Sequence, residues 1–397
     1  MTYDFTTYYD RMQTKASKWV MMLRQNPDVP PGVVPMTTAD MDFVQAPQIN
    51  QALKDYIDHN LLGYSRPTDA YLDSILRHYQ SVWGYQARRE WVFTTPGVIP
   101  ALAAAVRVCA EPGEGVIMLT PIYGPLYEVV EGQGRRVVDC PMYIEQRRYQ
   151  IDFERFEQLC REERPKLFLL CSPHNPSGRV WSRDELKRLA DICEKYQVMV
   201  ASDEIHCDIM LGDLPHTVFN TVSPWAAKAI LCTSAGKTYN IQALQCANVF
   251  IQDAELYARY EEAHLVTGIE RANVLGMVAT AAAYEQAGEW LQAASAVIRH
   301  NHQLLLDFCA RYPEQFTAFL PDASFLGWVD CAGLGLDWQD LQRFLIDCHF
   351  YVNYGPPFGK AAEHFIRVNI GLPTHKLQEN LDRLAAGLQA RFGVRPQ

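Results

Sequence analysis

The chain has 397 residues, enough for two or three domains built around a large buried core. Hydrophobic residues make up 48% and charged residues 21%, which excludes a mainly disordered chain, and the 23 glycines and 23 prolines follow no collagen-like period. The formal net charge of −10, without a run of lysine or arginine, argues against sequence-independent binding to nucleic acid or to an anionic membrane.

No apolar run approaches the roughly 20 residues of a transmembrane helix, and the polar N-terminus lacks the apolar stretch of a signal peptide. The eleven cysteines are odd in number and scattered, and none of them forms a CxxC pair. This pattern favours buried, reduced thiols over a disulfide scaffold or a structural zinc site, so we expect a cytoplasmic protein.

The first 45 residues are expected to be irregular, and beyond them short apolar strands alternate with amphipathic helices. Strands are predicted at residues 115–119, 166–171, 198–202, 229–233 and 247–251, and helices at residues 99–110 and 183–196. Strands that are apolar throughout and separated by helices indicate an α/β architecture, in which helices cover both faces of a parallel sheet.

The pattern changes from about residue 270 onward. Residues 279–286 and 289–311 are predicted to be helices, and residues 324–330 and 365–370 are predicted to be strands. We therefore expect a large α/β domain over residues 46–280 and a smaller α+β domain over residues 281–397. Residues 1–45 are expected to form an N-terminal arm and part of the small domain. The chain contains no internal repeat and no low-complexity linker.

Four polar segments end or follow expected strands. They are residues 94–100, 172–178, 202–206 and 233–240. Ligands of doubly wound sheets bind outside the carboxyl ends of the strands, so these four segments are candidates for one shared site.

The first two segments offer a cradle and a rigid loop. Gly97 precedes an apolar helix, and the free N–H groups at a helix N-terminus suit a phosphate, although glycine is also common in ordinary strand-to-helix turns. Pro173 and Pro176 bracket Asn175 and would aim its amide, with a simple polar turn as the alternative.

The other two segments carry ionisable groups. Asp203 and His206 could ligate a metal or pair with a charged ring nitrogen, and the alternative is a helix cap or a solvated turn. Lys237 lies among small residues at a strand end. Desolvation there would lower the pKa of its amine and make it a nucleophile for carbonyl groups, whereas a lone lysine is ordinarily a surface residue.

Two other enzyme classes fit the sequence poorly. Residues 236–238 are similar to the end of a phosphate-binding P-loop, but Leu231 stands where that loop needs glycine, and the acidic segment comes before it rather than after it. A metal hydrolase would draw its ligands from Asp40, Asp42, Asp203 and His206. The spacing of these residues is not typical of a metal site, and no metal is expected.

Taken together, these segments resemble the fold-type I enzymes that use pyridoxal 5'-phosphate (PLP), in the aminotransferase class I/II superfamily. The resemblance is strongest to the MalY/PatB group of cystathionine β-lyases, also called C–S lyases, and covers nearly the whole chain. It rests on residues 38–43, 63–65, 97–99, 121–123, 171–176, 202–206, 234–240 and 365–369. It implies the aspartate aminotransferase-like fold, with a mostly parallel central sheet in a large domain and a smaller α+β domain.

The resemblance also implies how PLP is held. Lys237 would be the Schiff-base lysine and the base that moves the Cα proton, Asp203 the partner of the pyridinium nitrogen, and Tyr123 the aromatic ring stacked on the cofactor. The other implied contacts are the N–H groups of Gly97, Val98 and Ile99 together with Ser234 at the phosphate, Asn175 and His206 at the phenolic oxygen, and Tyr64 of a neighbouring subunit at the phosphate.

For the substrate, the resemblance implies that Arg367 clamps the α-carboxylate, where a planar guanidinium fork is better suited than lysine. Tyr64 and Asp42 complete the expected substrate-binding set, and the role of Tyr64 implies a homodimer with shared active sites. Three positions depart from the family pattern, namely Gly236, Gln245 and residues 371–373. These departures leave the side-chain specificity open.

The implied reaction is an α,β-elimination that cleaves L-cystathionine or a related S-substituted cysteine to a thiol, pyruvate and ammonia, as part of sulfur amino-acid metabolism. An aminotransferase acting on an L-amino acid would use the same lysine, aspartate and arginine, and His206 and Gln245 favour the lyase. A regulator built on the same fold is a third alternative. The retention of Lys237, Asp203 and Arg367 together argues against a degenerate site.

Overall fold

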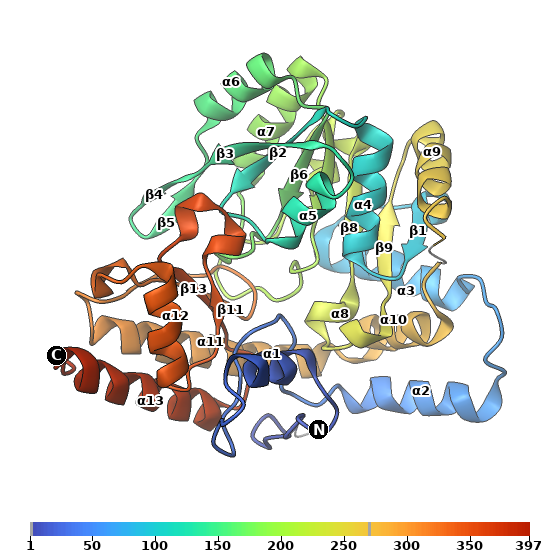
Figure 1. The fold of residues 1–397 in the computed structure, drawn as a ribbon. Coiled ribbons are helices and arrows are strands. Elements are labelled where there is room, and N and C mark those ends of the chain that lie inside the picture. The colour runs from blue at the N-terminus through green and yellow to red at the C-terminus, as the bar shows by residue number, and fades with distance from the viewer. Residues whose placement is uncertain (1–2, 269–270) are drawn as a thin grey trace.

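Two β-sheets organise the structure, a computed structural model that describes residues 3–268 and 271–397 (Figure 1). Within these residues the larger sheet has seven strands in the order β1-β9-β8-β7-β6-β2-β3, and the smaller has four in the order β10-β11-β13-β12. A separate hairpin joins β4 (Tyr143–Glu145) to β5 (Arg148–Gln150).

The large sheet is parallel except at one strand. Its strands are β1 (Val92–Thr95), β2 (Gly115–Thr120), β3 (Arg136–Pro141), β6 (Leu167–Cys171), β7 (Met199–Asp203), β8 (Ile230–Thr233) and β9 (Ala247–Phe250). Strand β9 runs antiparallel to both β1 and β8, so the parallel direction predicted for residues 247–251 is wrong. The chain turns back through the short helix α8 (Ala235–Thr238) instead of crossing a face of the sheet, which a parallel connection requires.

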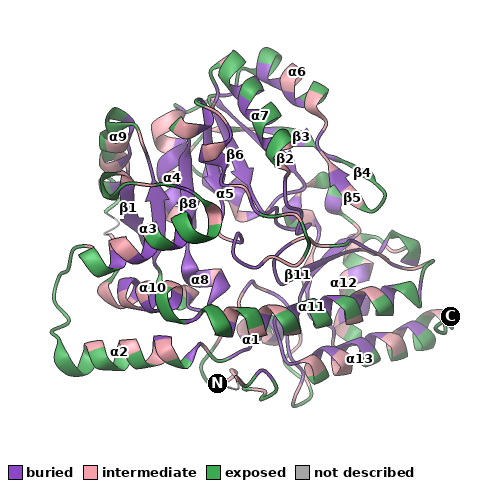
Figure 2. Ribbon diagram, turned by 180° about the vertical axis from the view of Figure 1, so that it is seen from behind, coloured by how far each residue is buried: buried purple, intermediate pink, exposed green. Residues whose placement is uncertain are grey.

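Helices cover both faces of the large sheet, as the sequence predicts. Along β2, Val116 and Met118 pack into the core on one face, and Ile117 and Leu119 pack into the core on the other, because side chains alternate along a strand. The first face is covered by α4 (Val98–Cys109), α5 (Pro125–Glu131) and α9 (Ala254–Leu265), and the second by α6 (Phe153–Glu163) and α7 (Arg183–Tyr196). Figure 2 shows the strands buried between helices whose outer sides are exposed.

The small sheet is antiparallel throughout. Its strands are β10 (Thr317–Ala318), β11 (Leu326–Asp330), β12 (Asn353–Tyr354) and β13 (Phe365–Asn369). It shares a core with α11 (Gly288–Ala310), α12 (Trp338–Asp347) and α13 (Thr374–Phe392). The other α-helices of the described chain are α1 (Ser17–Gln25), α2 (Pro47–His59), α3 (Asp69–Trp83) and α10 (Val274–Gln286). Short 3-10 helices are η1 (Arg89–Trp91), η2 (Phe219–Thr221), η3 (Ala226–Lys228), η4 (Gln242–Leu244), η5 (Ala332–Leu334), η6 (Pro356–Phe358) and η7 (Lys360–Ala362).

Helix α1 corrects the prediction that residues 1–45 are irregular. Ala16 precedes it and makes no side-chain cap, so the sequence carries no start signal for this helix. Trp19 and Met22 are three residues apart, lie on one face and are buried in the core of the small sheet. Tertiary burial therefore stabilises a helix that local sequence does not announce.

The two sheets fall in different parts of the chain. The seven-stranded sheet lies within residues 46–280 and the four-stranded sheet within residues 281–397, and the three-part domain division remains a prediction. All eleven cysteines are free. Across the described ranges, no three or more His, Cys, Asp or Glu side chains gather where they could hold a metal. No described helix combines the length and the apolar character needed to cross a membrane.

A buried histidine on α11 makes the stability depend on pH. His302 lies with Nε2 3.2 Å from the carbonyl oxygen of Ser324, and burial lowers the pKa of its imidazole to about 4. An unfolded histidine has a pKa of about 6.5, so between these values the unfolded chain binds a proton that the folded chain does not. Lowering the pH from 7 to 5 should therefore remove about 2 kcal/mol of folding free energy through this one group.

Urea unfolding at both pH values measures this effect in wild type and in His302→Gln. The wild type should lose about 2 kcal/mol more than the variant between pH 7 and pH 5. His59→Gln, at an exposed position on α2, is the control and should lose as much as wild type. Equal losses in wild type and His302→Gln would show that His302 is not the group responsible.

Candidate active site

One cavity of about 270 Å³ collects the chemically active side chains at the carboxyl ends of β7 and β8. It is lined by Ala39, Pro96, Gly97, Val98, Ile99, Pro100, Tyr123, Asn175, Asp203, Ile205, His206, Ser234, Lys237, Gln242, Gln245 and Cys246. Every cofactor contact predicted within one chain is among them, so four segments far apart in sequence meet at this edge of the sheet.

The start of α4 forms one wall of the cavity. Gly97 is the residue before the helix, with φ of +134°, a conformation that residues with a Cβ atom rarely adopt. The first N–H groups of a helix have no partner within it and face the helix N-terminus, where they favour an anion. Gly97, Val98 and Ile99 line the cavity at this helix start, and their role as an anion cradle remains a prediction.

Lys237 lies on the short helix α8. The hydroxyl of Ser234 caps this helix by accepting a hydrogen bond from the Gly236 N–H at 3.0 Å, and it donates to the carbonyl oxygen of Cys246 at 2.7 Å. The Lys237 amine donates to the carbonyl oxygen of Ala39 at 2.5 Å. Burial lowers the pKa of Lys237 to about 8, an effect that the carboxylate of Asp40 opposes. A neutral, nucleophilic amine is thus accessible near neutral pH.

Asp203 ends strand β7 and His206 follows it, but burial shifts the pKa values of the two side chains in opposite directions. Burial raises the pKa of the Asp203 carboxyl to about 7, although its Oδ1 accepts a hydrogen bond from the Ile205 N–H at 3.2 Å. Burial lowers the pKa of His206 to about 3, and its Nδ1 lies 3.1 Å from the hydroxyl of Ser324. The cavity therefore holds a carboxylate without a close cationic hydrogen-bond partner and a neutral imidazole.

Arg367 on β13 is a buried cation held only by neutral groups. Its Nη1 donates to Oδ1 of Asn175 at 3.0 Å and its Nη2 donates to Oδ1 of Asn353 at 2.9 Å, while Nε is buried without a hydrogen bond. The guanidinium also lies 5.0 Å from the centre of the Phe358 ring and 5.9 Å from that of Tyr123. No carboxylate among the described residues forms a salt bridge with it, so the site is electrostatically prepared for an anionic ligand.

Three predicted residues are not among those that line this cavity. Arg367 contacts Asn175 in the cavity wall, whereas Tyr64 and Asp42 lie elsewhere. Tyr64 is fully exposed and lines a separate surface cavity together with Arg66. The Asp42 carboxylate is buried against the Lys18 amine at 2.8 Å and the Arg11 guanidinium at 3.2 Å. Asp42 lines a different cavity, of about 210 Å³. The substrate-binding roles of all three residues remain predictions.

The structure also adds residues that the sequence did not indicate as parts of a site. Asn353 and Ser324 come from the small sheet and its preceding loop and contact Arg367 and His206. Neither is part of a recognisable segment, and no local signal could have found them. The Ala39 carbonyl lies within residues 38–43, a segment that the family resemblance includes.

Comparison with known proteins identifies the family. The model of the family "Aminotransferase class I and II" matches residues 31–384. The chain belongs to this family. Its fold is therefore the one predicted from the sequence, and the family prediction is confirmed.

Two curated relatives and one solved structure give the finer likeness. The chain is 35% identical to Cystathionine beta-lyase PatB of Bacillus subtilis (strain 168), over 89% of this chain and 92% of the relative. It is 33% identical to Protein MalY of Escherichia coli (strain K12), over 98% and 99% of the two chains. The structure of cystalysin from Treponema denticola, which contains a pyridoxal 5'-phosphate cofactor, superposes with a TM-score of 0.96 at 34% identity, covering 98% of this chain and 100% of cystalysin.

Proposed function

We propose that this family member is a PLP-dependent carbon–sulfur β-lyase that cleaves L-cystathionine or related S-substituted cysteines to a thiol, pyruvate and ammonia. The likeness to PatB and cystalysin supports the assignment. The observation that carries it is the cavity in which a buried amine with a lowered pKa lies near a buried carboxyl, with the guanidinium of Arg367 bound to Asn175 of the cavity wall and free of any salt bridge to the described residues. The free cysteines fit a reducing, cytoplasmic compartment.

The residues around the cavity suit PLP. The raised pKa of Asp203 reflects a buried carboxylate in need of a cation, which a protonated ring nitrogen would supply. Lys237 would hold the aldehyde carbon and Tyr123 would lie against the ring. The remaining contacts would come from Gly97, Val98, Ile99 and Ser234 at the phosphate and from Asn175 and His206 at the ring oxygen. When bound, PLP withdraws electrons from the Cα atom of an amino acid.

The chain's own side chains then orient the substrate and move its proton. Arg367 binds the α-carboxylate through a planar fork, whose direction Asn175 and Asn353 fix. The neutral amine of Lys237 takes the proton from Cα while the Ala39 carbonyl holds one of its N–H groups. Loss of the Cα proton allows the Cβ–S bond to break, and the bonding electrons leave with sulfur.

A second copy of the chain would complete the site. Lys237 is the one lysine or arginine among the residues that line the described cavity, so a bound phosphate would lack a dedicated cation there. Tyr64 is exposed, and so are the apolar side chains of Ile57, Leu61 and Leu62, which precede it in the chain. A homodimer would bury this surface and bring Tyr64 to the partner's phosphate site. Sedimentation of the purified protein as a dimer, and restored activity when Tyr64→Ala and Lys237→Ala chains are mixed, are the expected results.

Pyruvate release tests the proposed reaction. Purified protein saturated with PLP should produce pyruvate from L-cystathionine without any keto-acid acceptor. Amino transfer that appears only after a keto acid is added would identify an aminotransferase instead. Absence of a visible cofactor absorption band under saturating PLP would contradict the cofactor assignment.

The glycine before α4 provides a test of the phosphate cradle. Gly97→Ala should weaken PLP binding about tenfold or more, because a Cβ atom is strained at φ of +134° and the backbone must shift the N–H groups beside it, at about 1–3 kcal/mol. Titration of the cofactor-free protein with PLP measures the change. Gly84→Ala is the matched control.

Gly84 also has a positive φ, of +68°, and has open space around its Cβ position, but it ends α3 away from the cavity. Gly84→Ala should lower the melting temperature and leave the affinity for PLP unchanged. Equal losses of affinity in the two variants would mean that strain alone, and not the position of the cradle, accounts for the effect.

A further inference from the structure

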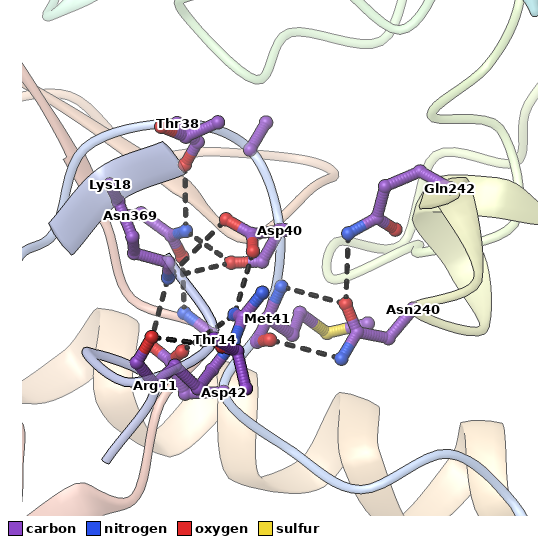
Figure 3. Close-up of polar contacts among 12 residues, drawn as sticks. Arg11, Thr14, Lys18, Thr38, Asp40, Met41, Asp42, Asn240, Gln242 and Asn369 are labelled. Carbon is purple, nitrogen blue, oxygen red and sulfur yellow. Dashed lines mark hydrogen bonds and ion pairs between the residues drawn. The ribbon is translucent and has the colours of Figure 1, made fainter. Parts of the chain in front are cut away.

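Beside the cavity, four charged side chains form a cluster that the proposed reaction does not use (Figure 3). Lys18 places its amine 2.8 Å from Oδ2 of Asp42 and 3.5 Å from Oδ1 of Asp40. Arg11 reaches Oδ2 of Asp40 at 2.7 Å and Oδ1 of Asp42 at 3.2 Å. The Lys18 and Asp42 side chains are 1% and 2% exposed, whereas Asp40 is 13% and Arg11 32% exposed, so Lys18 and Asp42 form the enclosed part of the cluster. Buried ion pairs contribute little net stability, so a gain in folding free energy does not by itself explain this cluster.

The cluster holds the chain segment that receives the Lys237 amine. The Lys18 amine also donates to the backbone carbonyl of Asp40 at 2.9 Å. Asn369, two residues beyond Arg367, donates to the same carbonyl at 2.7 Å and to that of Thr38 at 2.8 Å. Residues 38 and 40 are thus fixed on either side of Ala39, whose carbonyl accepts the lysine hydrogen bond.

The helix that carries Lys237 is tied to the same segment. Asn240 accepts a hydrogen bond from the Met41 N–H at 3.0 Å and donates to the carbonyl oxygens of Met41 and Phe43 at 2.9 and 2.8 Å, as Figure 3 shows for Met41. The lysine and its acceptor are therefore positioned by one connected network. Within it, Asp40 Oδ1 is buried and accepts no hydrogen bond, although the Lys18 amine lies 3.5 Å from it.

We propose that Asp40 is a positioning residue for Lys237: it fixes the neighbouring Ala39 carbonyl and supplies the negative charge that lets the buried amine both take up and release a proton. The role serves the proposed function, because a base that accepts the Cα proton must hold it until it is passed on. Burial and the guanidinium of Arg367 both disfavour the charged amine, and Asp40 is the largest effect that opposes them.

The charged groups around Lys237 come from four elements. Asp40 on the segment before α2 and Asp203 on β7 favour the protonated amine, whereas Arg367 on β13 and Lys18 on α1 disfavour it. His206 is also close enough for Lys237 to disfavour its protonation. Removing Asp40 and removing Lys18 should therefore move the Lys237 pKa in opposite directions.

Chemical labelling of the full-length, cofactor-free protein tests this inference without depending on catalysis. Only the neutral amine reacts with trace acetic anhydride, so mass spectrometry of the Lys237 peptide against pH gives the midpoint of its titration. Wild type should have a midpoint near pH 8. Asp40→Asn should lower it by about one pH unit, and Lys18→Gln should raise it. Asp40→Glu should restore the wild-type midpoint.

Asp42→Asn is the matched control, because it removes the other carboxylate of the cluster and its bond to Lys18. It should leave the midpoint within a few tenths of a pH unit of wild type, since Asp42 is not among the main charges acting on Lys237. Loosening of the site by any variant would admit water and raise the midpoint toward the ordinary lysine value. A rise, or no change, in Asp40→Asn would overturn the proposal.

A second measurement uses the protein saturated with PLP. The acid limb of kcat for pyruvate release should move to lower pH in Asp40→Asn by the shift seen in labelling. Failure of the wild type to release pyruvate would overturn the proposed function. The labelling midpoints would still test whether Asp40 sets the titration of Lys237, because they do not depend on catalysis. Unequal shifts in the two measurements would contradict the role of Asp40 in the reaction.

Discussion

Replacing Lys237 with alanine should remove the visible absorption band of bound PLP and lower kcat for pyruvate release by about 10⁴-fold or more. The structure offers no substitute for this amine, because Lys237 is the one lysine or arginine that lines the described cavity. The Ala39 carbonyl accepts a hydrogen bond from Lys237, but a backbone carbonyl cannot act as a base at neutral pH. Absorption spectra and pyruvate assays on wild type and Lys237→Ala, both with excess PLP, measure the two effects.

Lys187→Ala is the control for this substitution. Lys187 is exposed on α7 and pairs with Asp191 at 2.6 Å, so its loss changes the same charge on the protein without touching the cavity. It should keep the band and the activity of wild type. Retention of the cofactor band and of full activity in Lys237→Ala would contradict both the assignment of the lysine and the reaction built on it.

Five of the seven strands of the large sheet could be predicted within one or two residues, because a strand buried on both faces leaves a continuous apolar run. Strands β1 and β3 are not among the predicted strands. The direction of β9 could not be predicted in this way. Residues 247–250 are as apolar as those of the parallel strands, and what reverses the chain is a short turn around Lys237. An apolar run predicts that a strand is buried, but it does not predict the direction of that strand in the sheet.

The site was predictable where it is built from strand ends and was not where it is built by the small sheet. Asn175 and Lys237 follow β6 and β8, and Asp203 is the last residue of β7. These strands are adjacent, so sheet topology alone brings the three residues together. Asn353 and Ser324 come from the small sheet and its preceding loop, and they contact Arg367 and His206 rather than lining the cavity. Asp42 could not be placed from the sequence either. It lies in the segment 38–43, but its carboxylate forms an ion pair with Lys18.

Arg367→Lys should lower kcat/KM for pyruvate release about 10²- to 10³-fold, mainly through a higher KM. The guanidinium is oriented by two amide oxygens, on Asn175 and Asn353, and presents a planar fork that a lysine amine cannot reproduce. Each hydrogen bond to a charged group contributes about 1.5–3 kcal/mol, so loss of the two-point contact with a carboxylate amounts to about 3–4 kcal/mol. Steady-state kinetics with L-cystathionine measure the change.

The matched control is Arg383→Lys, on α13. Arg383 is half-buried, and its Nε is likewise buried without a hydrogen bond. It also donates to an asparagine, Asn380, which unlike Asn175 does not line the cavity. Its replacement should leave kcat/KM unchanged. A loss in Arg367→Lys that falls on kcat alone, with KM unaltered, would mean that Arg367 acts on the proton transfer at Lys237 rather than on the carboxylate. Arg367 also lowers the pKa of Lys237. In that case the positive charge of Arg367, and not the planar geometry of its guanidinium, would account for the loss.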